Sequence, residues 1–172
     1  MKKIDPKYSK KNVLEFIQHS NYIEREFRPI AVRDALRAWD YLSKKEAISK
    51  EEWIPTILEV HRLLLKRVRP DIAGQLRKLD VMVGGRLCPG WERVPELLAR
   101  WVEVYSDPET DEETLTSHVE FETIHPFEDG NGRVGRLILN WQRMKVGLPL
   151  FVVHLGLEQY HYYESFRLIS SE

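Results

Sequence analysis

The sequence predicts an all-α fold with one small β-hairpin. Apolar residues recur at helical spacing along most of the chain, and helix start and stop signals bound these stripes. One short segment instead alternates apolar and polar residues around a glycine pair, which is typical of a hairpin. With 172 residues, 42% of them hydrophobic and 31% charged, the chain is long enough for a domain with its own hydrophobic core.

Amphipathic stripes place the helices in order along the chain. A stripe from Val32 to Leu42 follows Pro29, and a capping box that begins at Ser49 starts a second helix that continues to Leu64. The acidic residues at 111–113 favour a helix N-terminus because they complement the helix dipole. Further helices are therefore expected at 97–105, at 112–125, from about 132 to 144 and from about 158 onward.

The hairpin is expected between Leu79 and Pro89. Gly84 and Gly85 separate two short apolar runs, and a glycine pair accommodates the positive φ angles of a tight hairpin turn. An irregular loop is the alternative interpretation of this segment. A polar run at 44–50 is the only weak internal boundary, and we therefore expect an N-terminal helical region at 1–48 and a second region at 49–172.

Charge and composition exclude several classes of protein. Lys and Arg total 26 against 27 Asp and Glu, which argues against nucleic-acid binding driven by bulk positive charge. Cys88 is the only cysteine, so an internal disulfide is excluded. The N-terminal segment is polar and no run of about 18 apolar residues occurs, so we expect no secretory signal, no membrane span and a cytoplasmic location.

The segment 125–136 has the composition of an anion-binding turn. Pro126 disfavours helical backbone at the residue before it, so a helix is expected to end at His125. Gly130 and Gly132 permit a tight turn into a new helix near Gly132. The first N–H groups of such a helix are unpaired and carry positive dipole, which together favour a bound anion.

The side chains of this turn indicate phosphate chemistry. Arg133 and Arg136 are three residues apart, so they share one helix face and can bind several oxygens of a polyphosphate. Asp129 could hold Mg²⁺ and His125 could act as a general base, which predicts a nucleotide site where a hydroxyl attacks phosphorus. A calcium loop is disfavoured because Arg133 and Asn140 fall at its ligand positions, and a purely structural turn is the remaining alternative.

The same segment resembles the signature of the Fic family, H-P-F-x-[D/E]-G-N-G-R-x-x-R, at every defined position. Residues 74–77, 81–86 and 94–97 are similar to the family's target-docking flap and the helix after it, and 162–166 to its late helix beside the adenine. The resemblance covers the chain from about position 50 onward and implies a Fic-type helical bundle whose hairpin is the flap. Doc-type kinases carry Asn-Lys where this chain has Asn131-Gly132, which favours the adenylylating branch.

This resemblance implies transfer of AMP from ATP to a Ser, Thr or Tyr hydroxyl of a target protein, with release of pyrophosphate. In that reaction His125 would deprotonate the hydroxyl, Asp129 would hold Mg²⁺ between the α- and β-phosphates, and Phe127 would anchor the loop. The implied nucleotide contacts are an anion hole at Gly130, Asn131 and Gly132, a β/γ-phosphate clamp of Arg133 and Arg136, the flap backbone at Val83, Gly84, Gly85 and Arg86, and Tyr162 beside the adenine. The target protein would dock at the flap by strand-like pairing.

An upstream segment resembles the inhibitory helix of many family members, [S/T]-x-x-x-E-[G/N]. Ser20 and Glu24 match this pattern, whereas Arg25 stands in place of Gly or Asn. The resemblance implies that Glu24 pairs with Arg136 and blocks the γ-phosphate, because one guanidinium cannot satisfy both partners. A local contact of Glu24 with Arg25, or an ordinary surface helix with a solvated Glu24, is the alternative.

Several further hypotheses remain open. His118, Glu122 and His125 recur at helical spacing and could bind a metal, although a structural role for His118 is favoured. His61 lies in an apolar stripe and is expected to be a packing histidine. AMP removal, transfer of another phosphate-linked group and a non-catalytic partner-binding module are the alternative functions. The sequence leaves the oligomeric state open, a homodimer included.

Overall fold

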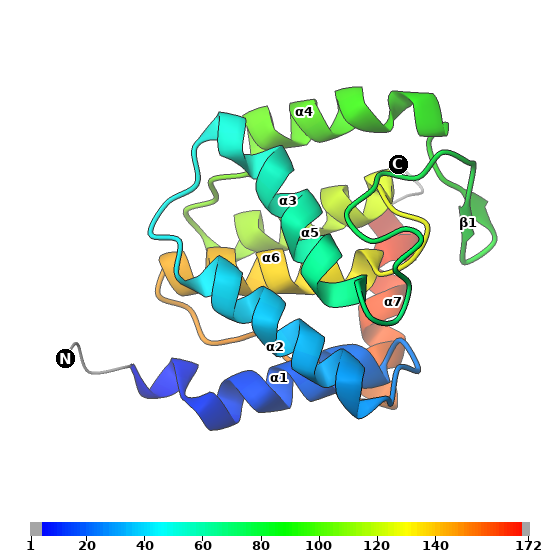
Figure 1. Cartoon of the computed structure of the whole chain (residues 1–172). Helices are drawn as coiled ribbons and strands as arrows, with labels where there is room; N and C mark the ends of the chain where they lie inside the picture. The colour runs from blue at the N-terminus through cyan, green and yellow to red at the C-terminus, as the bar shows by residue number, and fades with distance from the viewer. Residues whose placement is uncertain (1–4, 170–172) are drawn as a thin grey trace.

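The computed structural model describes residues 5–169 and confirms an all-α fold with one small hairpin (Figure 1). The helices within these residues are α1 (Lys10–Tyr22), α2 (Pro29–Ser43), α3 (Lys50–Leu65), α4 (Val94–Tyr105), α5 (Asp111–Ile124), α6 (Asn131–Lys145) and α7 (Leu157–Ile169). Strands β1 (Met82–Val83) and β2 (Arg86–Leu87) form the hairpin, and short 3₁₀ turns lie at Pro6–Tyr8 and Trp91–Arg93. Across 5–169 no helix combines the length and the apolar character needed to span a membrane.

Helix α6 runs through the middle of the molecule, and α1, α2, α3 and α5 pack against it (Figure 1). Nearly every residue of its first three turns is buried, polar side chains such as Arg136, Asn140 and Gln142 included. The single core cluster takes side chains from both sides of the polar run at 44–50 and includes Phe16, Leu42, Trp53, Leu64, Trp101, Phe121 and Leu137. Helix α6, which carries Arg133 and Arg136, is therefore packed into this core.

Tryptophans pack against one another in this core. Trp53 makes edge-on contacts with Trp101 and with Trp141, each with ring centroids 5.4 Å apart. Such T-shaped pairs are favoured by the aromatic quadrupole and add about 0.5–1.5 kcal/mol beyond the area that they bury. Because Trp141 lies on α6, these contacts fix the position of α6 relative to α3 and α4.

Local signals set most helix ends. The capping box at Ser49 forms as expected: the backbone N–H of Ser49 donates to the Glu52 carboxylate (3.1 Å). Helix α6 begins at Asn131, slightly before the predicted start near Gly132, because Gly130 adopts the left-handed conformation (φ 83°) and already accepts the Val134 N–H (3.0 Å). The turn that the glycines permit is therefore tighter than the sequence predicts.

The hairpin confirms the expected glycine turn. Gly84 and Gly85 have φ angles of 58° and 84°, and two successive positive φ angles are those of a type I′ turn. Met82 pairs with Leu87 and Val83 with Arg86, in antiparallel register. The hairpin projects from the edge of the bundle (Figure 1), and Met82 and Leu87 are about two-thirds exposed, at 67% and 64%.

Candidate active site

His125 lies at the junction of α5 and the loop that leads to α6. It adopts the left-handed conformation (φ 50°), which ends α5 at the point that Pro126 predicts. Burial lowers the pKa of His125, and the nearby Arg77 also lowers it, so the imidazole is neutral at neutral pH. Its Nδ1 is buried and accepts no hydrogen bond among the described residues.

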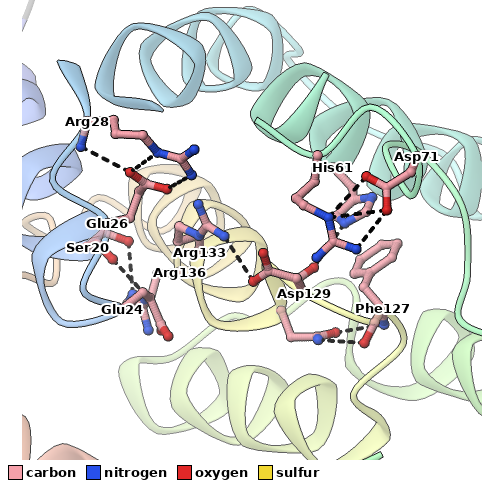
Figure 2. Close-up of polar contacts among 12 residues, drawn as sticks. Ser20, Glu24, Glu26, Arg28, His61, Asp71, Phe127, Asp129, Arg133 and Arg136 are labelled. Carbon is pink, nitrogen blue, oxygen red and sulfur yellow. Dashed lines mark hydrogen bonds and ion pairs between the residues drawn. The ribbon is translucent and has the colours of Figure 1, made fainter. Parts of the chain in front are cut away.

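Phe127 and Asn131 close the loop on itself. Phe127 is fully buried, and its backbone N–H donates to Oδ1 of Asn131 while its carbonyl accepts from Nδ2, both at 2.8 Å (Figure 2). The amide of Asn131 is therefore occupied by the loop backbone. The backbone N–H of this residue is what the anion hole implied by the resemblance would use.

His61 on α3 packs against the loop between α5 and α6 and is a packing histidine, as expected. Its ring stacks on Phe127 with centroids 3.7 Å apart and planes within 4°. Nδ1 accepts from the Gly74 N–H (2.9 Å), so Nε2 carries the proton and donates to the Asp129 carbonyl (3.1 Å). Burial lowers the pKa of His61 to about 4, which keeps this neutral tautomer at all physiological pH values.

Arg133 and Asp129 line the start of α6 (Figure 2). Nη2 of Arg133 donates to Oδ1 of Asp129 (3.1 Å), and the Arg133 side chain is only 6% exposed. Its Nε and Nη1 are buried and have no hydrogen-bond partner in the described part of the chain. Because buried guanidinium donors are costly to leave unpaired, this arrangement fits an anion bound at the helix N-terminus. The Asp129 carboxylate is 45% exposed, which leaves it accessible to a hydrated cation.

The guanidinium of Arg136 donates toward α1 and α7, whereas that of Arg133 donates to Asp129. Nε donates to Oγ of Ser20 (2.9 Å), and Nη2 donates to the Ser20 carbonyl (2.9 Å) and to Oε1 of Glu24 (2.7 Å; Figure 2). Nη1 donates to the Tyr162 hydroxyl (3.2 Å), whose oxygen also lies 2.8 Å from Nε2 of His118. The sequence-derived residues Ser20, Glu24, Arg136 and Tyr162 thus meet at one point.

The segment that carries Glu24 leaves the helix sooner than the resemblance implies. Helix α1 ends at Tyr22, and the N–H groups of Arg25 and Glu26 bond to the carbonyls of Tyr22 (2.9 Å) and Asn21 (3.0 Å). These two bonds form a Schellman motif, with Arg25 at its left-handed position (φ 57°). Glycine and asparagine tolerate this conformation best, which gives a physical reason for [G/N] at this place in the family pattern.

Replacing Arg25 by glycine is expected to stabilise the protein by about 0.5–1 kcal/mol. Left-handed backbone costs an L-residue about 1–2 kcal/mol, of which the greater flexibility of glycine in the unfolded chain takes back a part. Urea unfolding measures the difference. The matched variant Arg33→Gly, on the exposed face of α2, should lose about 1 kcal/mol instead. A loss of stability in both variants would contradict the prediction.

Glu122 and His118 lie behind Arg136 and do not form the metal site that their spacing suggested. Across residues 5–169, the ligand atoms of His118, Glu122 and His125 do not gather around one point. A side chain at Gly135 would meet Oε1 of Glu122 and the His118 ring, so glycine lets these two side chains pack closely against α6. Oε1 of Glu122 is buried without a hydrogen-bond partner in the described residues, and burial raises the pKa of this carboxyl to about 8.

Glu122 should therefore make stability depend on pH. With its pKa raised to about 8 in the folded protein, against 4.5 in the unfolded chain, the folded state holds one more proton between these values. Stability contributed by the protonated carboxyl is complete below about pH 4.5 and falls, by at most about 1.4 kcal/mol per pH unit, as pH rises to 8. Unfolding measured from pH 5 to 9 should show this fall for the wild type relative to Glu122→Gln. Parallel profiles would exclude a protonated Glu122.

Arg77 joins the base of the hairpin to the end of α5 at His125, a role that the sequence did not reveal. Its side chain is fully buried. Its guanidinium donates to the carbonyls of His125 (2.8 Å), Leu79 (2.9 Å), Ile124 (3.4 Å) and Pro89. These acceptors include both ends of the hairpin segment and both residues at the end of α5. Arg77 therefore holds the hairpin and the His125 backbone in a fixed relation.

Comparison with known proteins assigns this arrangement to a family. The Fic/DOC family model matches residues 53–142, which include the hairpin and the whole of segment 125–136. The chain belongs to the Fic/DOC family. The Fic resemblance of the sequence is thereby confirmed. The match runs from α3 to α6 and therefore includes His61, His125 and both motif arginines.

Curated relatives are named protein adenylyltransferase Fic. The one from Drosophila willistoni is 34% identical over 121 residues, which are 67% of this chain and 24% of that protein. The one from Nematostella vectensis is 33% identical over 132 residues, 72% of this chain and 29% of that protein. The chain thus spans about a quarter of the length of these Fic proteins.

Solved Fic structures share the fold well beyond the motif. A structure of Fic-1 from C. elegans superposes with a TM-score of 0.75 at 27% identity, over 93% of this chain and 56% of that chain. A Fic family protein from Desulfovibrio desulfuricans G20 gives a TM-score of 0.75 at 25% identity, over 97% of this chain and 59% of that chain. The Fic-type helical bundle is therefore confirmed, with α1 and α2 included in the similarity.

Proposed function

We propose that this Fic domain transfers AMP from ATP to a hydroxyl of a target protein. The observation that supports this most strongly is Arg133, whose buried Nε and Nη1 have no protein partner in the described residues and lie on the first turn of α6. A triphosphate supplies the acceptors that these donors need. The names of the curated relatives support adenylyl transfer as the reaction.

In this proposal His125 is the general base. Its Nε2 takes the proton of the target hydroxyl while the hydroxyl oxygen forms a bond to the α-phosphorus. The bond from that phosphorus to the bridging oxygen of the β-phosphate breaks, and pyrophosphate leaves. Because the pKa of His125 is lowered by burial, the imidazole can accept this proton at neutral pH.

The start of α6 binds the phosphates. The backbone N–H groups at Gly130, Asn131 and Gly132 and the guanidinium of Arg133 would neutralise charge that develops on the phosphate oxygens. Asp129 would hold Mg²⁺, which when bound neutralises phosphate charge and orients the leaving group. Arg136 would bind the γ-phosphate once its protein partners withdraw. Tyr162, whose hydroxyl bonds Arg136, would lie beside the adenine.

The hairpin would dock the target. The backbone of Val83, Gly84, Gly85 and Arg86 lies in a short, exposed hairpin that projects from the bundle. An exposed strand edge offers N–H and C=O groups to an extended peptide, which holds the peptide without regard to most of its side chains. Since Arg77 ties the hairpin to the carbonyl of His125, a peptide bound here would lie at a fixed position relative to the base.

Glu24 would restrain this activity. In the described structure it takes the Nη2 donor of Arg136 that the γ-phosphate would need, and Ser20 takes two further bonds. The pair with Arg136, not a local contact with Arg25, is thus what the geometry favours. The Glu24 side chain remains 32% exposed, so it can withdraw without unfolding the core.

Glu24→Gly is therefore expected to raise AMP transfer about 10–100-fold. A charge-assisted hydrogen bond of this kind contributes about 1.5–3 kcal/mol, which is the free energy that nucleotide binding no longer has to overcome. Label from [α-³²P]ATP incorporated into the protein itself measures the gain. Glu46→Gly, exposed in the loop between α2 and α3, is the control. An unchanged rate in Glu24→Gly would exclude inhibition by this residue.

The reaction itself is tested by the position of the label. Incubation of Glu24→Gly with Mg²⁺ and ATP should transfer label from the α- but not the γ-phosphate to protein, with the mass increase of one AMP. Label from the γ-phosphate would indicate a kinase reaction, and release of AMP from a modified protein would indicate AMP removal. No transfer of label by a protein that binds ATP would favour a partner-binding module.

A further inference from the structure

A second cluster of ligand-type side chains lies away from the catalytic loop, where α1 meets the segment before α7. Glu15 and His19 are four residues apart on α1 and therefore share one face of that helix. His154 precedes α7. One ligand atom of each of these three side chains lies within 4.8 Å of the other two. Of the residues that the structure describes, these three form the only such group.

The orientation of His154 is that of a metal ligand. Its Nδ1 is 2.7 Å from Oε2 of Glu158, the same oxygen that accepts the His154 backbone N–H (3.1 Å). A carboxylate in this position fixes the tautomer with the proton on Nδ1, as carboxylates behind metal-bound histidines usually do. Nε2 then points its lone pair toward Oε1 of Glu15, 3.7 Å away.

His19 completes the set with an imidazole whose bonding capacity is unfilled. Its ring centroid is 4.3 Å from that of His154, and its Nδ1 is buried without a hydrogen-bond partner among residues 5–169. An imidazole nitrogen without a partner can bind a metal ion in the neutral form of the ring.

We propose that Glu15, His19 and His154 bind a divalent transition metal of the zinc type, which joins α1 to the start of α7. Two imidazoles and one carboxylate are a ligand set that Zn²⁺ accepts, with a fourth position left for water. Ligand atoms around tetrahedral zinc lie roughly 3.3 Å apart, so side-chain rotations within the present 4.8 Å suffice to close the site. Glu158 is a positioning residue that orients His154 from behind.

The position of this site gives it a structural consequence. Ser20, the residue after His19, accepts a hydrogen bond from Arg136, and Glu24, four residues further along the chain, accepts another. On the other side, Gln159 and Tyr163 of α7 donate to the carbonyl of Ile23 (3.1 and 3.4 Å). A metal between α1 and α7 would hold the segment 20–26 against Arg136. Any effect of this metal site on AMP transfer rests on the proposed function.

Zinc binding by the full chain, prepared without a polyhistidine tag, tests the site independently of catalysis. Titration calorimetry with ZnCl₂ should give one ion per chain, and Co²⁺ in its place should give the visible absorption of a tetrahedral complex. His154→Ala should weaken zinc binding at least 100-fold, and Glu158→Gln about 10–100-fold, as loss of a carboxylate behind a ligand does. The control His161→Ala, exposed on α7 and outside the cluster, should bind zinc as the wild type does.

A second readout tests the link between the two helices. Zinc at about 100 times its dissociation constant should raise the unfolding temperature by several degrees and slow amide exchange at 19–26, in the wild type but not in His154→Ala. The arrangement without a metal would be an ion pair of protonated His154 with Glu15 and Glu158. No saturable zinc binding, or equal binding by the wild type and His154→Ala, would show that this ion pair is all the cluster forms.

Discussion

Replacing His125 by alanine is expected to lower the rate of AMP transfer by about 10²–10⁴-fold, the range that loss of a general base produces. ATP binding should persist, because the proposed phosphate ligands lie on α6 and the alanine changes none of them. The rate is measured as α-phosphate label incorporated per minute, with Glu24→Gly present in both proteins so that the parent rate is high. ATP affinity is measured separately by calorimetry.

The conformation of His125 requires a second variant. At a φ of 50°, alanine is itself unfavourable by roughly 1 kcal/mol, whereas asparagine tolerates left-handed backbone. His125→Asn should therefore lose as much transfer activity as His125→Ala and keep more of the stability. Transfer by His125→Asn within tenfold of the parent would show that His125 is not the base.

The pH profile reports the same group. Burial and the charge of Arg77 lower the pKa of His125 below its usual 6.5. The base is then deprotonated throughout the neutral range, and the transfer rate should fall only as the pH drops below that value. A rate that still rises between pH 7 and 8 would assign the base to another residue, with Glu122 as the nearest candidate by its raised pKa.

Elements specified by local chemistry could be predicted from the sequence. The capping box at Ser49 fixes the start of α3 by contacts between residues three apart, and Gly84 and Gly85 fix the hairpin by their own positive φ angles. The end of α5 at His125 follows in the same way from Pro126. Each of these features depends on a few neighbouring residues, which is why it is visible without knowledge of the fold.

The geometry around Arg136 depends on tertiary contacts and could be predicted only through the family pattern. Ser20 and Glu24 lie 116 and 112 residues before their partner, and no local rule joins them. The pattern placed Glu24 on a helix, yet the chain turns at Tyr22 into a Schellman motif. This turn moves the Glu24 carboxylate beyond the helix end, where it reaches the guanidinium.

Arg77 shows the limit of sequence reasoning most clearly. It lies in a turn region with no strong helical or strand pattern, so nothing local indicates that its charge is buried. Its acceptors are backbone carbonyls, two of them 47 and 48 residues away at Ile124 and His125, and every residue type has a carbonyl. The identity of an acceptor residue therefore carries no signal, and only the folded chain reveals the contact.

Arg77→Met is accordingly expected to destabilise the protein by about 3–5 kcal/mol, the largest effect on stability predicted for this chain. Methionine fills similar space but donates nothing, so the carbonyls of His125, Leu79 and Pro89 lose a buried partner. Urea unfolding at constant m-value measures the loss. Arg62→Met is the matched control, since Arg62 is exposed and pairs with Glu59 on the same helix, and it should lose less than about 1 kcal/mol.

Arg77→Lys separates geometry from charge at this position. Lysine keeps the positive charge but cannot reach carbonyls at both ends of the hairpin with one ammonium group, so we expect most of the stability loss to remain. Fast amide exchange at 79–89 and at 124–126 should accompany it, because these two segments share the guanidinium as their common donor. An Arg77→Lys variant as stable as the wild type would mean that the positive charge alone is needed. The hairpin would then be held to His125 by packing rather than by the hydrogen bonds of the Arg77 guanidinium.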